Sequence, residues 1–257
     1  DWSADYRMYG CNRVQPEQLF DVVRRHICAM DDGPAVVALD DTRIRKTGKK
    51  TFGAKYTRDP LGPPFHVNFI RAQRFLQTSM AIKNGDGQAR MVPVDWFHTP
   101  VPQKPGKKAT PQERAQYEKQ CELARIGLVG AERIGQLRAW MDKNQQEQRR
   151  LWSVVDGSFT NGTVLKRLPH NTTLVGRIRS DAKLYFLPSM QPDKGRRRAY
   201  GEQAPTPEQL RQDDQHPWEQ LEVFFGGQKR QLRAKRITPL RWRAAGLPSL
   251  IVAVNIS

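Results

Sequence analysis

From residue 35 to residue 46 the chain carries the sequence Ala-Val-Val-Ala-Leu-Asp-Asp-Thr-Arg-Ile-Arg-Lys, an apolar run that meets two carboxylates and then a cationic segment. Short apolar runs rich in β-branched residues predict buried strands, here from Ala35 to Asp40. A second such run, from Leu151 to Val155, is followed directly by Asp156. The sequence therefore predicts two buried strands that each stop at a carboxylate.

Carboxylates at the ends of neighbouring strands suit Mg²⁺, which prefers oxygen ligands and leaves positions open for phosphate. Side chains alternate across a strand, so only one of Asp40 and Asp41 should face such a site. Each carboxylate also has a purely structural explanation. Asp40 and Asp41 can end a strand or pair with Arg43 and Arg45, and Asp-Gly at residue 156 is an ordinary turn signal.

The composition indicates a nucleic-acid partner. The 257 residues include 43 Lys and Arg against 26 Asp and Glu, a net charge of +17 with a sequence pI near 10.2. Such an excess of positive charge is typical of nucleic-acid binders, although a merely basic soluble or ribosome-like protein would share it. No basic amphipathic helix stands out, and no apolar stretch approaches the ~20 residues of a membrane span. We expect no membrane partner.

The cysteines and the absence of a secretory signal favour a reducing compartment, and we expect a cytoplasmic protein. Cys11, Cys28 and Cys121 are odd in number and lack metal-ligand spacing. The chain opens at Asp1 rather than Met, so we expect a segment upstream of it.

Hydrophobic periodicity and turn residues predict the remaining elements. We expect helices at Pro16–Met30, at Thr110 to about Arg150 with a break near residues 127–135, and at Gly162–Leu168. We expect strands at His66–Ile82 (one or two), Thr172–Arg179, Glu219–Phe225, Gln228–Lys235 and Ser249–Ile256, and loops at Thr42–Lys50, Asp95–Pro111 and Ser180–Pro217. Strands, a long helix and a further strand favour a mixed α/β sheet.

Several stretches resemble the DDE transposases of bacterial insertion sequences. Asp40-Asp41-Thr42 with Lys46-Thr47-Gly48-Lys49 is similar to the first-strand signature, and residues 156–161, Asp-Gly-Ser-Phe-Thr-Asn, to the second-aspartate signature. Residues 176–185 resemble the strand and loop that follow, and the basic hairpin at 224–235 resembles the inserted sheet. The resemblance implies an RNase H-like mixed sheet with flanking helices, interrupted by a small β-rich insertion, from about Val36 to the C-terminus.

The resemblance divides the chain into four parts. They are an N-terminal helical segment (1–34), the first part of an RNase H-like catalytic core (35–185), a polar linker (186–217) and the β-rich insertion (218–257), with the core incomplete at its C-terminal end.

In the family, two aspartates and a later Glu within a Tyr-Arg-Glu pattern hold the metal. The pattern of Asp, one residue, then Thr favours Asp40, with Asp41 as the alternate, and Asp156 as the second ligand. The Tyr-Arg-Glu pattern is absent, because Glu222 is the last acidic residue. We expect the chain to stop inside or just after the insertion. A nuclease of the same fold would instead recruit Glu202, Glu208, Glu219 or Glu222 as its third ligand.

Basic and aromatic residues around these motifs are candidate DNA contacts, and several of them also have a purely structural explanation. Lys46, Lys49 and Lys50 could hold backbone phosphates or simply form a solvated loop. Arg177 and Arg179 could bind phosphate or pair with acidic neighbours. Trp242 could stack on a base or belong to the core. The hairpin residues Lys229, Arg230 and Arg233 would contact transposon-end DNA.

The function that the resemblance implies is that of a transposase catalytic core. Two Mg²⁺ or Mn²⁺ ions would support cleavage of double-stranded DNA at the transposon end and then strand transfer into target DNA. A bacterial, nucleoid-associated enzyme, dimeric on paired ends, would follow. The alternative is a catalytically incomplete DNA-binding remnant, and a third option is a nuclease of the same fold.

Overall fold

The computed structural model describes residues 15–48, 50–63, 65–83, 88–189, 195–225, 227–246 and 251–256. Its helices are α2 (Pro16–Met30), α3 (Pro111–Leu123), α4 (Ile126–Lys143), α5 (Gly162–Leu165) and α6 (Pro207–Gln212). Its strands are β1 (Ala35–Arg45), β2 (Lys55–Arg58), β3 (Phe69–Lys83), β4 (Ala89–His98), β5 (Leu151–Val155), β6 (Thr172–Gly176), β7 (Leu184–Phe186), β8 (Glu219–Phe225), β9 (Gln228–Trp242) and β10 (Ile251–Ile256).

The larger sheet is mixed and has the RNase H-like arrangement that the sequence predicts. Its strand order is β2-β3-β1-β5-β6, and β4 also pairs with β3. β1 is antiparallel to β3 but parallel to β5, which in turn is parallel to β6. Parallel neighbours need a crossover connection, and the chain between β1 and β5 supplies it through α3 and α4.

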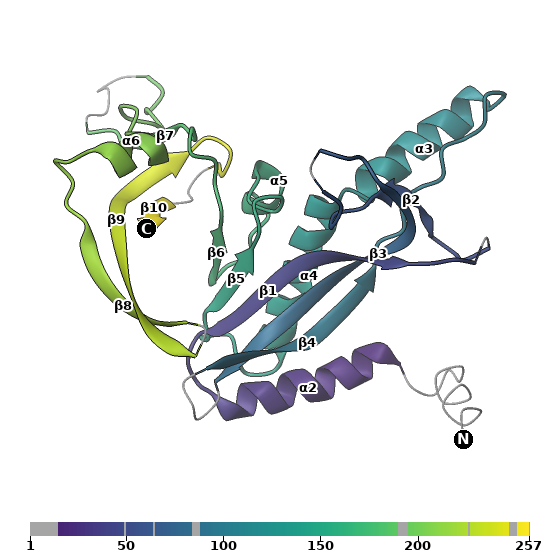
Figure 1. Ribbon diagram of the computed structural model, residues 1–257, viewed down its shortest axis with the longest axis horizontal. Coiled ribbons are helices and arrows are strands. Elements are labelled where there is room, and N and C mark those ends of the chain that lie inside the picture. The colour runs from purple at the N-terminus through teal and green to yellow at the C-terminus, as the bar shows by residue number, and fades with distance from the viewer. Residues whose placement is uncertain are drawn as a thin grey trace.

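Helices α2 and α4 flank this sheet and share its apolar core (Figure 1). The buried face of α4 and the buried end of α2 meet the strands in one cluster, which includes Ile27, Cys28, Val37, Leu39, Leu76, Met80, Ile134, Leu137, Met141 and Leu151. β1 lies between β3 and β5 at the centre of the sheet. Its last buried residue before the aspartates, Leu39, therefore pairs with a strand on each side.

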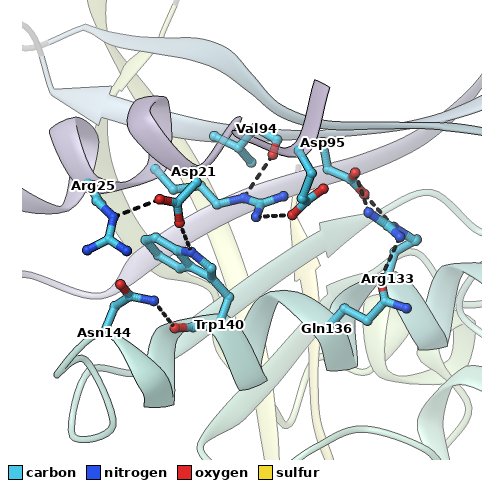
Figure 2. Close-up of polar contacts among 10 residues, drawn as sticks. Asp21, Arg25, Val94, Asp95, Arg133, Gln136, Trp140 and Asn144 are labelled. Atoms are coloured by element: carbon cyan, nitrogen blue, oxygen red, sulfur yellow. Dashed lines mark hydrogen bonds and ion pairs between the residues drawn. The ribbon is translucent and has the colours of Figure 1, made fainter. Parts of the chain in front are cut away.

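A polar network joins α2, β4 and α4 beside that core (Figure 2). Nε of Arg24, a buried residue, donates to the Val94 carbonyl at 2.9 Å. The indole nitrogen of Trp140 donates to Asp21 Oδ1 at 2.6 Å. Asp95, also buried, forms a two-pronged ion pair with Arg133 of α4. Buried polar groups are stable only when paired, so these contacts specify one packing of the helices on β4.

The smaller sheet has the order β10-β9-β7, with β8 also paired to β9, and lies at the opposite end of the molecule from α3 (Figure 1). It has its own core of Leu184, Ala204, Leu210, Ile237 and Leu240. Lys235 is 2% exposed, and its Nζ donates to the carbonyls of Arg211 (3.3 Å) and Asp213 (2.6 Å). The buried ammonium thereby holds the C-terminal end of α6 against β9.

The helix at Pro16–Met30 and the strands at Leu151–Val155 and Glu219–Phe225 are confirmed. The expected end of the first strand at Asp40 is wrong, because β3 continues the antiparallel ladder as far as the pair Arg45↔Ala72. The break in the long helix falls at residues 124–125, before Gly127 rather than between Gly127 and Gly135.

The stretch Ser180–Pro217, expected to be loop, contains β7 and α6. Thr206 and Gln209 form a capping box at the start of α6, Pro207 occupies its first turn, and Leu210 is buried. These are standard helix-start signals. The helix has six residues and only one of them, Leu210, is buried, so hydrophobic periodicity does not reveal it.

Candidate active site

The strand register brings Asp40 and Asp156 to neighbouring positions. The last parallel pair between β1 and β5 is Leu39↔Val155, so the two aspartates are the next residues on adjacent strands. Leu39 and Val155 are buried, and because side chains alternate along a strand, Asp40 lies on the other face. Asp40 and Asp156 are both exposed.

The two carboxylates repel each other. The pKa of Asp40 is raised above its ordinary value of 3.8, first by desolvation and then by the charges of Asp156 and Asp41. A hydrogen bond from the Asp41 backbone N–H to Asp40 Oδ1 (2.8 Å) opposes the shift. Among the described residues neither Asp40 nor Asp156 forms an ion pair, whereas Asp41 lies 3.7 Å from Nη2 of Arg43. An unneutralised pair of this kind favours a cation.

The loop after β5 holds Asp156 through local hydrogen bonds. Asp156 Oδ1 accepts from the Ser158 backbone N–H (2.9 Å) and from the Ser158 hydroxyl (2.6 Å). The Thr160 hydroxyl donates to the Asp156 carbonyl at 3.0 Å. Asn161 ends the loop and caps α5 by accepting from two backbone N–H groups. The carboxylate therefore stands on a turn with a defined shape.

Phe159 anchors this loop in the core. Its side chain is fully buried, and a β-carbon at Gly130 of α4 would stand 2.8 Å from its Cε1 atom and 3.2 Å from Leu39 Cδ2. Only a glycine lets α4 approach the ring so closely. Phe159 thus connects the Asp156 loop to α4 and to the residue that precedes Asp40.

A third carboxylate does not join the pair within the described ranges. They contain no group of three or more His, Cys, Asp or Glu side chains that could hold a metal. Of the candidate third ligands, Glu208 is paired with Arg211 and Glu222 with Lys229, and Glu202 and Glu219 also lie in the small-sheet region. Two carboxylates still fit Mg²⁺, which often takes only one or two and completes its shell with water and substrate phosphate.

Of the expected DNA contacts in the first loop, Lys46 is not beside the carboxylates. Lys46 follows β1, so it lies about 20 Å from Asp40 along the strand, at ~3.3 Å per residue. It lines an open pocket of about 520 Å³ with Arg45 and Arg71. Lys50 is exposed, and Lys49 lies outside the described residues.

Arg177 and Arg179 were expected on a strand, but β6 ends at Gly176, because its partner β5 ends at the paired residue Val155. Both arginines are exposed, and Arg179 binds Asp181 through two hydrogen bonds of 2.9 and 3.0 Å. Arg179 thus pairs with an acidic neighbour, as the alternative to phosphate binding predicts.

The predicted insertion residues lie on β9. Lys229 is exposed and 2.8 Å from Glu222, Arg230 is exposed, and Arg233 lies over the Trp218 ring at 5.2 Å. Trp242 is half-buried and packs against the core of the small sheet, which supports its core alternative. Sequence reasoning overlooked Trp218, whose ring also lies 4.8 Å from Lys235 Nζ.

Sequence reasoning also missed a basic groove of about 630 Å³ beside the Asp156 loop. Arg125, Lys166 and Arg167 are exposed and line it. Arg125 directly precedes α4, and Lys166 and Arg167 directly follow α5, some 40 residues later in the chain, so only the packing of the two helices could reveal the cluster.

The raised pKa of Asp40 predicts a pH-dependent stability difference. The folded protein retains the Asp40 proton to higher pH than the unfolded chain, so ionisation lowers stability as pH rises through the shifted pKa. Asp40→Asn should therefore raise the thermal midpoint near pH 7, and the gain should vanish as pH falls below about 4. Thermal unfolding across pH checks this. Asp32→Asn, at an exposed site outside the carboxylate pair, is the control variant. A pH-independent result for Asp40→Asn would contradict the carboxylate pair.

A family of known proteins matches most of the chain. The sequence model of a family described as DDE superfamily endonuclease matches residues 4–247. Searches of curated proteins and of solved structures find no match. Within the described ranges, no helix combines the length and apolar character needed to cross a membrane.

Proposed function

This chain belongs to the DDE superfamily endonucleases, and from that premise we propose that it is a transposase catalytic core. In this proposal it cuts double-stranded DNA at a transposon end and joins the exposed 3′-hydroxyl to target DNA. Asp40 and Asp156 would bind two Mg²⁺ or Mn²⁺ ions for this reaction. The proposal includes assembly as a dimer on paired ends and a bacterial, nucleoid-associated location.

The observation that carries the proposal is the juxtaposition of Asp40 and Asp156. They sit on adjacent parallel strands, one residue beyond the last buried pair, and the charge of one raises the pKa of the other. Maintaining two like charges at neighbouring positions of adjacent strands costs stability, and binding a cation would offset that cost. The net charge of +17 would draw the phosphate backbone to the same protein.

The residues of this chain have separable roles in such a reaction. Asp40 and Asp156 would hold the ions, which when bound activate the attacking water or 3′-hydroxyl and stabilise charge on the phosphate. Ser158 fixes the rotamer of Asp156 through its two hydrogen bonds, and Phe159 fixes the position of the loop. No covalent protein–DNA intermediate is needed, because the hydroxyl attacks the phosphate directly.

A second candidate function is favoured by the lack of a third carboxylate near the pair in the described part of the chain. In that case the protein binds DNA through its basic surface without cutting it. Losing one of three ligands would weaken Mg²⁺ affinity and misplace the ion, because Mg²⁺ requires near-ideal geometry.

One experiment distinguishes the two functions. Affinity for a labelled duplex is measured across KCl concentrations, and nicking of supercoiled plasmid is measured with Mg²⁺, Mn²⁺, Ca²⁺ or EDTA. We expect binding that falls steeply with salt, with a slope of roughly −0.9 per phosphate contact, and nicking only with Mg²⁺ or Mn²⁺. Salt-sensitive binding without any nicking would favour the second candidate. Absence of binding at low salt would contradict both.

A further inference from the structure

We infer that the groove between α4 and α5 binds backbone phosphates of the DNA strand that flanks the cleaved bond. The inference rests on the proposed function, because it assigns a role to a surface beside Asp156. The groove is lined by Arg125, Ile126, Gly127, Leu128, Ser158, Asn161, Gly162, Thr163, Lys166 and Arg167, and encloses about 630 Å³.

The composition of this lining selects an anion. Three lining residues are cationic, three carry a hydroxyl or amide, and none is acidic. Arg125, Lys166 and Arg167 are exposed, so a ligand can reach these residues directly. Arg167 donates to the Thr163 carbonyl through Nη1 (3.1 Å). A guanidinium carries five N–H donors, so Arg167 can also donate to a ligand.

The backbone of the lining adds donors to these side chains. Arg125 precedes α4, an 18-residue helix, and provides no side-chain cap. The Leu128 and Val129 N–H groups donate to the Arg125 carbonyl, whereas those of Ile126 and Gly127 have no intrahelical acceptor. Ile126 and Gly127, which start the helix, line the groove. A phosphate that meets three cations there would also meet the positive end of the helix dipole.

The groove and the carboxylate pair share a wall. Ser158 lines the groove and also donates both of its hydrogen bonds to Asp156 Oδ1. Asn161 lines it at the other end of the same loop. A strand that crosses the two aspartates can therefore continue into the groove, where its phosphates would set the register of the scissile bond. Phosphate contacts supply affinity and position rather than sequence reading.

The test compares two variants that each lose three positive charges. The groove variant combines Arg125→Gln, Lys166→Gln and Arg167→Gln, and the control combines Lys104→Gln, Lys107→Gln and Lys108→Gln, three exposed residues before α3. Long-range electrostatics are matched in number. Duplex affinity is measured by fluorescence anisotropy over a KCl series, and circular dichroism and thermal unfolding verify the fold. A single Lys166→Gln variant guards against misfolding of the triple variant.

We expect the groove variant to bind the duplex at least tenfold more weakly than the control. The slope of log affinity against log salt should fall by roughly 2–3, at ~0.9 per lost phosphate contact. Lys166→Gln alone should reduce this slope by ~0.9, the value for one phosphate contact. Calorimetry with inorganic phosphate alone should show only weak binding. Tight phosphate binding with unchanged duplex affinity in the groove variant would overturn the inference in favour of a small-anion site.

Failure of this inference is distinguishable from failure of the proposed function. If the groove and control variants bind DNA equally while nicking still depends on Asp156, the groove assignment is wrong and the active site stands. If the groove variant alone loses affinity while Mn²⁺ binding is indifferent to Asp156→Asn, the groove stands and the metal site is wrong.

Discussion

Asp156→Asn is expected to abolish Mg²⁺- or Mn²⁺-dependent cleavage, with a rate loss on the order of 10³-fold or more. Asparagine keeps the shape of the side chain and can still accept the hydrogen bonds from Ser158, but it cannot supply the negative charge that holds the ion. Metal ions contribute several kcal/mol of transition-state stabilisation, and each ~1.4 kcal/mol is tenfold in rate. Initial rates of plasmid nicking and Mn²⁺ titration by electron paramagnetic resonance measure the two effects.

The matched variants separate this site from general charge effects. Asp40→Asn should cause a similar loss, and the double variant should be little worse than either single one, because the two residues act as one unit. Asp181→Asn removes an exposed carboxylate that is paired with Arg179 and should change neither readout. Full nicking and unchanged Mn²⁺ affinity in Asp156→Asn would refute the assignment of Asp156 as a ligand.

Phe159→Ala is expected to have the largest effect on stability, a loss of about 3–5 kcal/mol in the free energy of unfolding. The ring is fully buried against Gly130 and Leu39, so its removal leaves a cavity between α4 and β1. Since a domain is stable by only ~5–15 kcal/mol, the variant should approach the limit of folding. The loop that carries Asp156 loses its anchor, so Mn²⁺ affinity should fall even in molecules that remain folded. Denaturant unfolding and Mn²⁺ titration check both expectations.

Two substitutions control this result. Phe52→Ala removes a ring that is 77% exposed and should change stability by less than about 0.5 kcal/mol. Phe159→Leu retains most of the buried volume and should restore much of the lost stability and metal affinity. Wild-type stability in Phe159→Ala would contradict the role of the ring as an anchor.

Where secondary structure depends on neighbours in the sequence, the sequence predicts it well. The helix Pro16–Met30 and the strand Leu151–Val155 have periodicity and breakers within a few residues, and their observed limits match the expected ones. The short helix at Pro207–Gln212 shows the same locality, since its capping box is visible in the sequence once caps are considered separately from periodicity.

The limits of β1 and β6 depend instead on partners far along the chain. β1 continues to Arg45 because β3 pairs with it there, and β6 stops at Gly176, opposite the last residue of β5. A strand exists as long as a neighbour accepts and donates its backbone hydrogen bonds, and no local pattern encodes the neighbour.

For the candidate site, the sequence by itself nominated Asp156 and one of Asp40 and Asp41, because these carboxylates follow runs of apolar residues, and the family resemblance favoured Asp40. The tertiary structure decided that the two strands are parallel neighbours in register, that Asp41 lies near Arg43 instead, and that Arg125 and Lys166 meet beside the same loop. The division has a physical cause. Local patterning selects which residues a strand or helix presents, whereas the distance between two such residues is set by packing of the shared core around Leu39 and Phe159.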